Sequence, residues 1–254
     1  MLRKLLICGL AAGLVAGIFA FGFMTVAGEP AVDQAIAYEE AQKPPVPAGQ
    51  EEPQLVSRDT QKGFGLLTAS TIYGLALGGI FALVFAYAYG RIARGGPART
   101  ALWLAVAAFV VVYLVPFLKY PPNPPAVGDP DTIDQRTALY LVMVWISILA
   151  AVAAVMLRRT LAERRPPQVA TFLAGAAYLV IVLVAGLALP TYQEIPATFP
   201  ATTLWQFRSA SVGAQLVMWA SIGLVFAAAA QQTMTGRPIW SSPAGRRAAV
   251  TAGE

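Results

Sequence analysis

The chain has 254 residues, of which 57% are hydrophobic and only 12% are charged. Soluble domains are on average about 45–50% apolar and about 25% charged, so the composition excludes an ordinary soluble domain, a disordered chain and a disulfide-rich scaffold. The sequence holds one cysteine and no histidine. It therefore has no internal disulfide, no Ser-His-Asp catalysis and no imidazole-bound metal site built from this chain alone.

Six apolar runs follow one another along the chain, and none contains Asp, Glu, Lys or Arg. A helix needs about 20 apolar residues to cross a bilayer core about 30 Å thick. Buried helices of a soluble protein would each need a polar face, which these runs lack. The sequence therefore predicts an all-α, polytopic membrane bundle of six helices in three hairpins, with spans at approximately 5–26, 64–89, 101–117, 138–157, 169–189 and 210–230.

The ends of these runs carry further signals. Tyrosines and tryptophans gather there, as in the aromatic belts of membrane proteins; they include Tyr87, Tyr89, Trp103, Tyr113, Tyr140 and Trp145. The third run is the shortest and ends at Pro116, so its helix should be either less tilted than the others or extended by a broken turn. We take residues 1–234 as one membrane domain and 235–254 as a disordered cytoplasmic tail.

Charge is distributed unevenly between the two sides of the predicted bundle. Loops 27–62, 118–136 and 190–208 hold six basic and eleven acidic residues, whereas the other side holds twelve basic and two acidic residues. Because basic residues stay in the cytoplasm, both termini should be cytoplasmic and these three loops, rich in proline, should be external. The net charge of +5 thus reflects membrane orientation, and we expect no nucleic-acid partner. The first run is longer than the core of a signal peptide, so we expect it to be retained as a helix.

The first external loop should contain a short helix over 29–36 and a solvated linker over 43–49. An arginine precedes each inward-going helix, namely Arg58, Arg136 and Arg208. These three arginines fit either a repeated hairpin, as in some transporters, or charges that simply mark the membrane surface.

Small residues recur at helical spacing in the first two runs. Gly9, Gly13 and Gly17 lie four apart, and so do Gly74 and Gly78. Glycines at this spacing let two backbones approach closely in lipid. The pattern predicts either packing within this bundle or, as the alternative, dimerisation.

The second external loop gathers three carboxylates, Asp129, Asp131 and Asp134, within six residues. Carboxylates attract hard cations, so these residues and Glu194 are candidates for an external mouth that attracts cations. The alternative is an Asp-Pro turn in which Asp134 or Thr132 caps the fourth helix. We expect loops 118–136 and 190–208 to pack together, and Arg136 and Arg208 to pair with these acids.

Three stretches carry a family resemblance: LKYPPNPPAVGDPDTIDQRT at 118–137, LPTYQEIPATFPATTLWQFRSAS at 189–211 and GEPAVDQAIAYEE at 28–40. On these residues the chain resembles the CbtA family of integral-membrane subunits of a cobalt transporter. The resemblance implies a multi-pass protein of the bacterial inner (plasma) membrane that takes part in cobalt uptake for cobalamin biosynthesis. It also implies a partner, CbtB, with a single span and a histidine-containing terminus. It supplies no catalytic residues.

The missing histidines bear on this expectation. Sites that hold Co²⁺ in preference to Mg²⁺ usually use nitrogen or sulfur ligands. Selectivity would then lie in the partner or in prior chelation, and the cargo could be a cobalt ion or a cobalt complex; we expect no cofactor. A scaffold that only binds a partner is the alternative, because no apolar run carries an ionisable residue. An enzyme is not expected, since neither a nucleophile with its base nor a P-loop is present.

Overall fold

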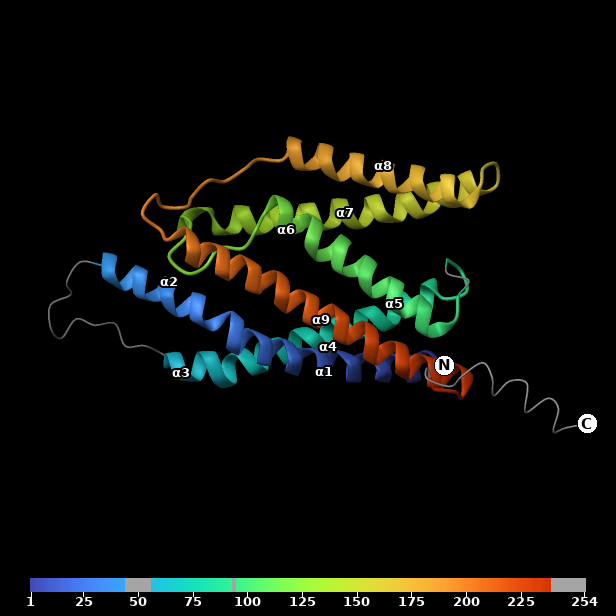
Figure 1. Ribbon diagram of the computed structural model, residues 1–254, viewed down its shortest axis with the longest axis horizontal. Coiled ribbons are helices and arrows are strands. Elements are labelled where there is room, and N and C mark those ends of the chain that lie inside the picture. Colours follow the sequence, from blue (N-terminus) through green and yellow to red (C-terminus); the bar gives the residue numbers. More distant parts are fainter. Residues whose placement is uncertain (44–55, 93–94, 239–254) are drawn as a thin grey trace, which may run out of the picture. The chain divides into compact units, whose positions relative to one another are not determined.

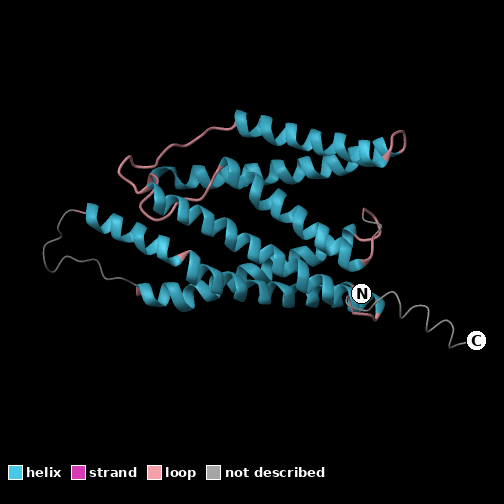
Figure 2. Ribbon diagram, viewed as in Figure 1, coloured by secondary structure: helices cyan, strands magenta, loops and turns pink. Residues whose placement is uncertain are grey.

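The computed structural model describes residues 1–43, 56–92 and 95–238. Within these ranges it contains helices and loops and no strand (Figure 1, Figure 2). Six helical stretches are long and apolar enough to cross a membrane, and each contains one predicted run to within a single residue, which confirms the predicted helical membrane bundle. Their bounds are Leu2–Ala27, Arg58–Ala88, Pro97–Lys119, Pro130–Ala162, Pro167–Ala188 and Ala201–Thr235.

Some of these stretches join several elements. The α-helices are α1 (Leu2–Ala27), α2 (Glu29–Gln42), α3 (Arg58–Thr60), α4 (Leu66–Ala88), α5 (Pro97–Ala108), α6 (Val115–Lys119), α7 (Ile133–Ala162), α8 (Pro167–Ala188) and α9 (Ala201–Thr235). π-helical segments over Gln61–Gly65 and Phe109–Leu114 join α3 to α4 and α5 to α6, and a 3₁₀ turn over Pro130–Thr132 precedes α7.

The third span continues past Pro116 to Lys119, so of the two predicted alternatives the structure has the extended helix. Proline lacks a backbone donor and its ring crowds the carbonyl four residues earlier, so an ordinary α-helix kinks or breaks there. Here the wider π-helical segment precedes the proline, and the Val115 amide donates to the Val110 carbonyl, five residues back. Such wide turns accommodate an interrupted hydrogen-bond ladder within a helix. The helix consequently extends to Lys119.

The chain divides into two compact units. The first comprises 1–23, 56–107 and 216–254, and the second comprises 24–55 and 108–215. We describe each unit by itself. The predicted tail begins where α9 ends, at Thr235, and most of it, 239–254, lies outside the described residues.

The first unit is built on the close approach of α1 and α4. A Cβ atom added at Gly17 would lie 2.6 Å from the Ser70 carbonyl oxygen, and one added at Gly9 would lie 2.6 Å from the Ala82 Cβ. Gly13 faces Gly74 equally closely. The predicted packing of these glycine faces within the bundle is therefore confirmed.

In the second unit α7 and α8 lie side by side (Figure 1). Met143, Ala150 and Val182 form a buried core between them. The hydroxyl of Ser147, which is fully buried, lies 2.9 Å from that of Tyr178, so this buried polar group is satisfied within the core.

The predicted helix over 29–36 is confirmed and is longer, because α2 reaches Gln42. Its Ala35 is buried against Val127 and Phe199, which belong to two different loops. The Tyr38 hydroxyl lies 2.7 Å from that of Thr198. Thus α2 packs on the loops that build the candidate site. The predicted linker at 43–49 lies, from residue 44 onward, outside the described residues.

Candidate functional site: a cavity between two loops

Two loops meet in the second unit, where α6 and α8 end and α7 and α9 begin. We call residues 120–129 the first loop and residues 189–200 the second loop. The Lys119 ammonium, at the end of α6, donates to the Leu189 carbonyl at 2.9 Å and to the Thr191 hydroxyl at 2.7 Å. The Tyr120 hydroxyl donates to the Pro190 carbonyl at 2.7 Å. The two loops therefore pack together, as the sequence analysis expected.

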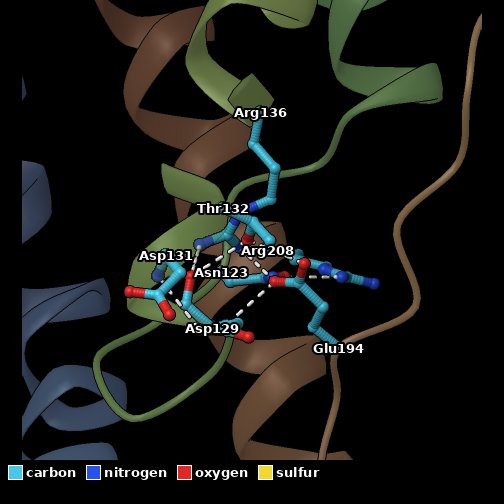
Figure 3. Close-up of polar contacts among 7 residues, drawn as sticks. All are labelled: Asn123, Asp129, Asp131, Thr132, Arg136, Glu194 and Arg208. Carbon is cyan, nitrogen blue, oxygen red and sulfur yellow. Dashed lines mark hydrogen bonds and ion pairs between the residues drawn. The ribbon is translucent and has the colours of Figure 1, made fainter. Parts of the chain in front are cut away.

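Glu194 is the centre of the contact between the loops (Figure 3). Its Oε2 accepts the Asp129 amide at 2.9 Å, and its Oε1 accepts the Thr132 hydroxyl at 2.7 Å. Arg136 Nη1 lies 3.3 Å from Oε2. The Asp129 amide first, then the Thr132 hydroxyl and the charge of Arg136 lower the pKa of the Glu194 carboxyl. Both oxygens of this ionised carboxylate are thus engaged within the protein.

Gly128 leaves room for the Arg136 guanidinium to lie against the first loop. Its Nη2 lies 3.4 Å from the Asp129 carbonyl oxygen. A Cβ at Gly128 would come within 2.8 Å of the guanidinium carbon, and Gly128 has φ +115, a conformation that side chains disfavour. Only glycine therefore combines this backbone turn with the position of Arg136. The Arg136 Nε is buried and, within the described part of the chain, has no hydrogen-bond partner.

Arg208 bonds neutral groups of the first loop, and not an acid as the sequence analysis expected. Its Nη2 donates to Asn123 Oδ1 at 2.9 Å, and its Nε donates to the Pro122 carbonyl at 3.4 Å (Figure 3). Among the described residues no ion pair of Arg208 is found, so the predicted pairing with an acid is wrong for this arginine. The reason is local, because the proline-rich part of the first loop presents an amide and a carbonyl to α9, and the acids come later in the chain.

The three aspartates are exposed. Asp129 accepts the Asp131 amide at 3.0 Å through Oδ1 and so caps the short turn before α7. Thr132 is the N-cap residue of α7, one of the two residues predicted for that position, but its side chain does not cap the helix, since its hydroxyl bonds Glu194 and the Asp129 carbonyl instead. No group of three or more Cys, Asp or Glu side chains able to hold a metal occurs in the described ranges.

Behind these contacts lies a cavity of about 370 Å³. We call it the loop cavity. Its walls carry three basic side chains and one acidic side chain, together with a cluster of aromatic rings. The lining residues are Tyr113, Phe117, Lys119, Tyr120, Pro121, Pro122, Asn123, Arg136, Thr137, Tyr140, Tyr192, Glu194, Ile195 and Arg208.

Tyr120 is a neutral hydrogen-bonding group in the loop cavity. Burial, and to a smaller extent the proximity of Tyr192, raise the pKa of the Tyr120 phenol, so its proton is retained at neutral pH. Tyr113 and Tyr140, which the sequence analysis assigned to an interfacial belt, line this cavity.

Three residues of the site escaped the sequence analysis, namely Lys119, Tyr120 and Asn123. Lys119 carried a usable signal, because it is the first charged residue after an apolar run. Of the three arginines considered together, Arg136 and Arg208 line the loop cavity, whereas Arg58 begins α3 in the first unit.

Comparison with known families supplies the identification. The CbtA family, described as a probable cobalt transporter subunit, matches residues 2–231. No curated protein and no solved structure matches the chain. The family match covers all six membrane-crossing helices up to residue 231 and both loops of the site. The chain therefore belongs to the CbtA family of probable cobalt transporter subunits.

Proposed function

We propose that this protein is the membrane-embedded subunit of a cobalt uptake system in the bacterial plasma membrane, with both termini in the cytoplasm. The observation that carries the proposal is the family match over residues 2–231. The uneven distribution of basic residues supports the orientation. In this orientation the loop cavity opens on the external side, where a cargo arrives.

The uptake system requires a partner. The chain has no histidine, and its described residues offer no cluster of metal ligands. Discrimination of cobalt against Mg²⁺ depends on nitrogen or sulfur ligands. A small single-span membrane subunit with histidines, resembling CbtB, would supply such ligands, and a link to cobalamin biosynthesis would account for the demand for cobalt.

The three exposed aspartates beside the loop cavity would raise the local concentration of cations at the entrance. Their contribution is one of long-range attraction and not of coordination. Glu194 contributes less to this attraction, because the Arg136 guanidinium lies 3.3 Å from its carboxylate and offsets the charge. We propose no catalytic activity for the chain.

A second candidate function is that of a scaffold that assembles the transporter and moves no cargo itself. It is favoured by one observation, namely that the six apolar runs contain no ionisable residue. Ion-coupled carriers usually place such residues within their spans.

Uptake of labelled cobalt tests the proposal and separates it from the scaffold. Cells lacking this gene, its single-span partner or both should lose uptake, and only the two genes together should restore it. Uptake that is unchanged after deletion of this gene would contradict the proposal. Full uptake by an overproduced partner alone would leave this chain the role of a scaffold.

A further inference from the structure

The geometry points to a specific class of cargo: the loop cavity binds cobalt as an anionic chelate, a metal ion wrapped by carboxylates, and not as bare Co²⁺. This inference rests on the proposed function, because it names the substrate of the same site. It follows from the charge, the unused donors and the size of the cavity.

Charge is the first argument. Lys119, Arg136 and Arg208 line the loop cavity, and Glu194 is the acidic residue among the lining residues. Each oxygen of the Glu194 carboxylate already accepts a hydrogen bond, from Asp129 or Thr132, and Arg136 offsets its charge. The exposed aspartates are not among the lining residues. A bare divalent cation inside this cavity would meet a positive field, whereas an anion would be attracted.

Unused donors are the second argument. A guanidinium carries five N–H groups and an ammonium carries three. Arg208 is fixed by Asn123 and Pro122 through Nη2 and Nε, so its Nη1 is left to meet a ligand. The Lys119 ammonium donates to two acceptors in the described structure, so its third N–H group can donate to a ligand. Arginine forks that are fixed in this way match the geometry of carboxylates.

The Nε of Arg136 gives the same indication. This atom is buried, and no hydrogen-bond partner is found for it within the described ranges. A buried donor without a partner is costly, and an acceptor that enters the cavity would relieve this cost.

Size and wall chemistry are the third argument. Pockets for small molecules range from about 300 to 1,000 Å³, and the loop cavity measures about 370 Å³. A bare ion requires ligands at about 2 Å and would be bound poorly in such a space. Tyr113, Tyr140, Tyr192 and Phe117 instead offer flat apolar faces, which suit the methylene groups of a chelator.

Two cobalt complexes that do not exchange their ligands test the inference directly. The full-length protein in phosphatidylcholine nanodiscs is titrated by calorimetry with the anionic Co(III)–EDTA complex, with the cationic tris(ethylenediamine)cobalt(III) complex and with CoCl₂. We expect the anionic complex to bind at least about tenfold more tightly than the other two, as befits charge-assisted contacts. Equal binding of the two complexes, or tighter binding of CoCl₂, would overturn the inference.

Variants locate the site. Arg208→Gln should weaken binding of the anionic complex about tenfold, and Arg208→Lys, which keeps the charge but loses the fork, should weaken it less. Arg58→Gln is the matched control, since Arg58 also begins a membrane-crossing stretch but lies outside the loop cavity. Thermal unfolding checks each variant, and Lys119→Gln replaces Arg208→Gln if the latter does not fold. Unchanged binding in a folded cavity variant would also overturn the inference.

The outcomes separate this inference from the proposed function. If cobalt uptake requires this gene but the protein does not prefer the anionic complex, the inference fails and the proposed function stands. If the protein binds the anionic complex but its deletion leaves cobalt uptake intact, the loop cavity is an anion site and the proposed function fails.

Discussion

The α1–α4 helix pair of the first unit and the loop pair of the second unit are held together in opposite ways. Gly9, Gly13 and Gly17 bring two backbones together by having no side chains. The loops instead meet through Glu194 and Arg136, whose polar atoms fill the contact. Helix contacts of the first kind tolerate no added volume, whereas loop contacts of the second kind tolerate no lost charge or donor. The predictions that follow probe this difference.

The largest effect is expected from Gly13→Leu. A side chain at this position would run into the backbone of Gly74 and Leu75. Because a helix backbone cannot yield as a flexible side chain does, α1 and α4 must separate, at a cost of about 3 kcal/mol, the upper end of the usual range for overpacking. Thermal unfolding of the purified protein in detergent measures the loss.

Gly22→Leu is the matched control for that variant. It lies on the same helix, and a Cβ there would meet nothing within 4 Å. Its melting temperature should stay near that of the wild type. Equal destabilisation by both substitutions would show that added bulk anywhere on α1, and not the close approach of α1 to α4, determines the effect.

A smaller effect, about 1–3 kcal/mol, is expected from Gly128→Ala. The methyl group would disfavour the φ of +115 and would also displace the Arg136 guanidinium. Gly90→Ala separates these two causes, because Gly90 has φ +77 but a methyl group added there would meet no atom within 4 Å. We expect Gly128→Ala to destabilise the protein more and, unlike Gly90→Ala, to lower cobalt uptake. Equal stability and uptake in the two variants would contradict the role assigned to Arg136.

Loss of the Glu194 charge should loosen the loops while the helices stay folded. Glu194→Gln is expected to lower cobalt uptake about threefold to tenfold at unchanged expression. Spin labels at the exposed positions Pro125 and Ala197, in a Cys8→Ser background, report the distance between the loops. A variant with wild-type uptake and a wild-type distance distribution would rule out this role of Glu194.

The same contact predicts a pH dependence. The folded pKa of Glu194 lies below its ordinary value of 4.5, so its stabilising contribution is present above that pH and disappears as the pH falls through the lowered value. The distance distribution of the spin labels should therefore stay constant from neutral pH to about 4.5 and broaden below it. In Glu194→Gln this transition should be absent.

The smallest effect is expected from Asp131→Asn. Asp131 is exposed, and its backbone amide, not its carboxylate, bonds Asp129. Stability should change by no more than about 0.5 kcal/mol. Because the inferred cargo is an anionic chelate, which the Asp131 carboxylate does not attract, cobalt uptake should not fall. Strongly reduced uptake would contradict the anionic cargo and would indicate that the aspartates are the main site of cation attraction.

The membrane-crossing helices could be predicted because each requires only a continuous apolar run. The helix ends were less predictable, since Ala201 and Pro97 begin helices several residues before the corresponding apolar runs. The continuation of the third span past Pro116 depends on a π-helical segment, and no residue pattern in the run predicts such a segment. The close approach of α1 and α4 was predictable, because it depends on glycines spaced four residues apart, and this spacing is visible in the local sequence.

The candidate site was predictable only in outline. The sequence placed Glu194, Arg136 and Arg208 in two loops that should meet, but it could not assign their partners. Glu194 bonds residues more than sixty positions away in the chain, and such pairs have no local pattern. Arg208 donates a hydrogen bond to the Asn123 side chain, whereas the sequence analysis expected an acidic partner. The sequence therefore identified the charged residues but not the charge balance of the cavity they line.

Uptake of labelled cobalt by cells that carry Arg208→Gln, with Arg58→Gln as the control, tests whether the cargo enters through the loop cavity. Both variants remove one arginine, but only Arg208 lines the cavity. We expect uptake reduced about tenfold in Arg208→Gln and wild-type uptake in Arg58→Gln, at equal amounts of folded protein. Wild-type uptake in Arg208→Gln, or equal losses in both variants, would contradict entry of the cargo through this cavity.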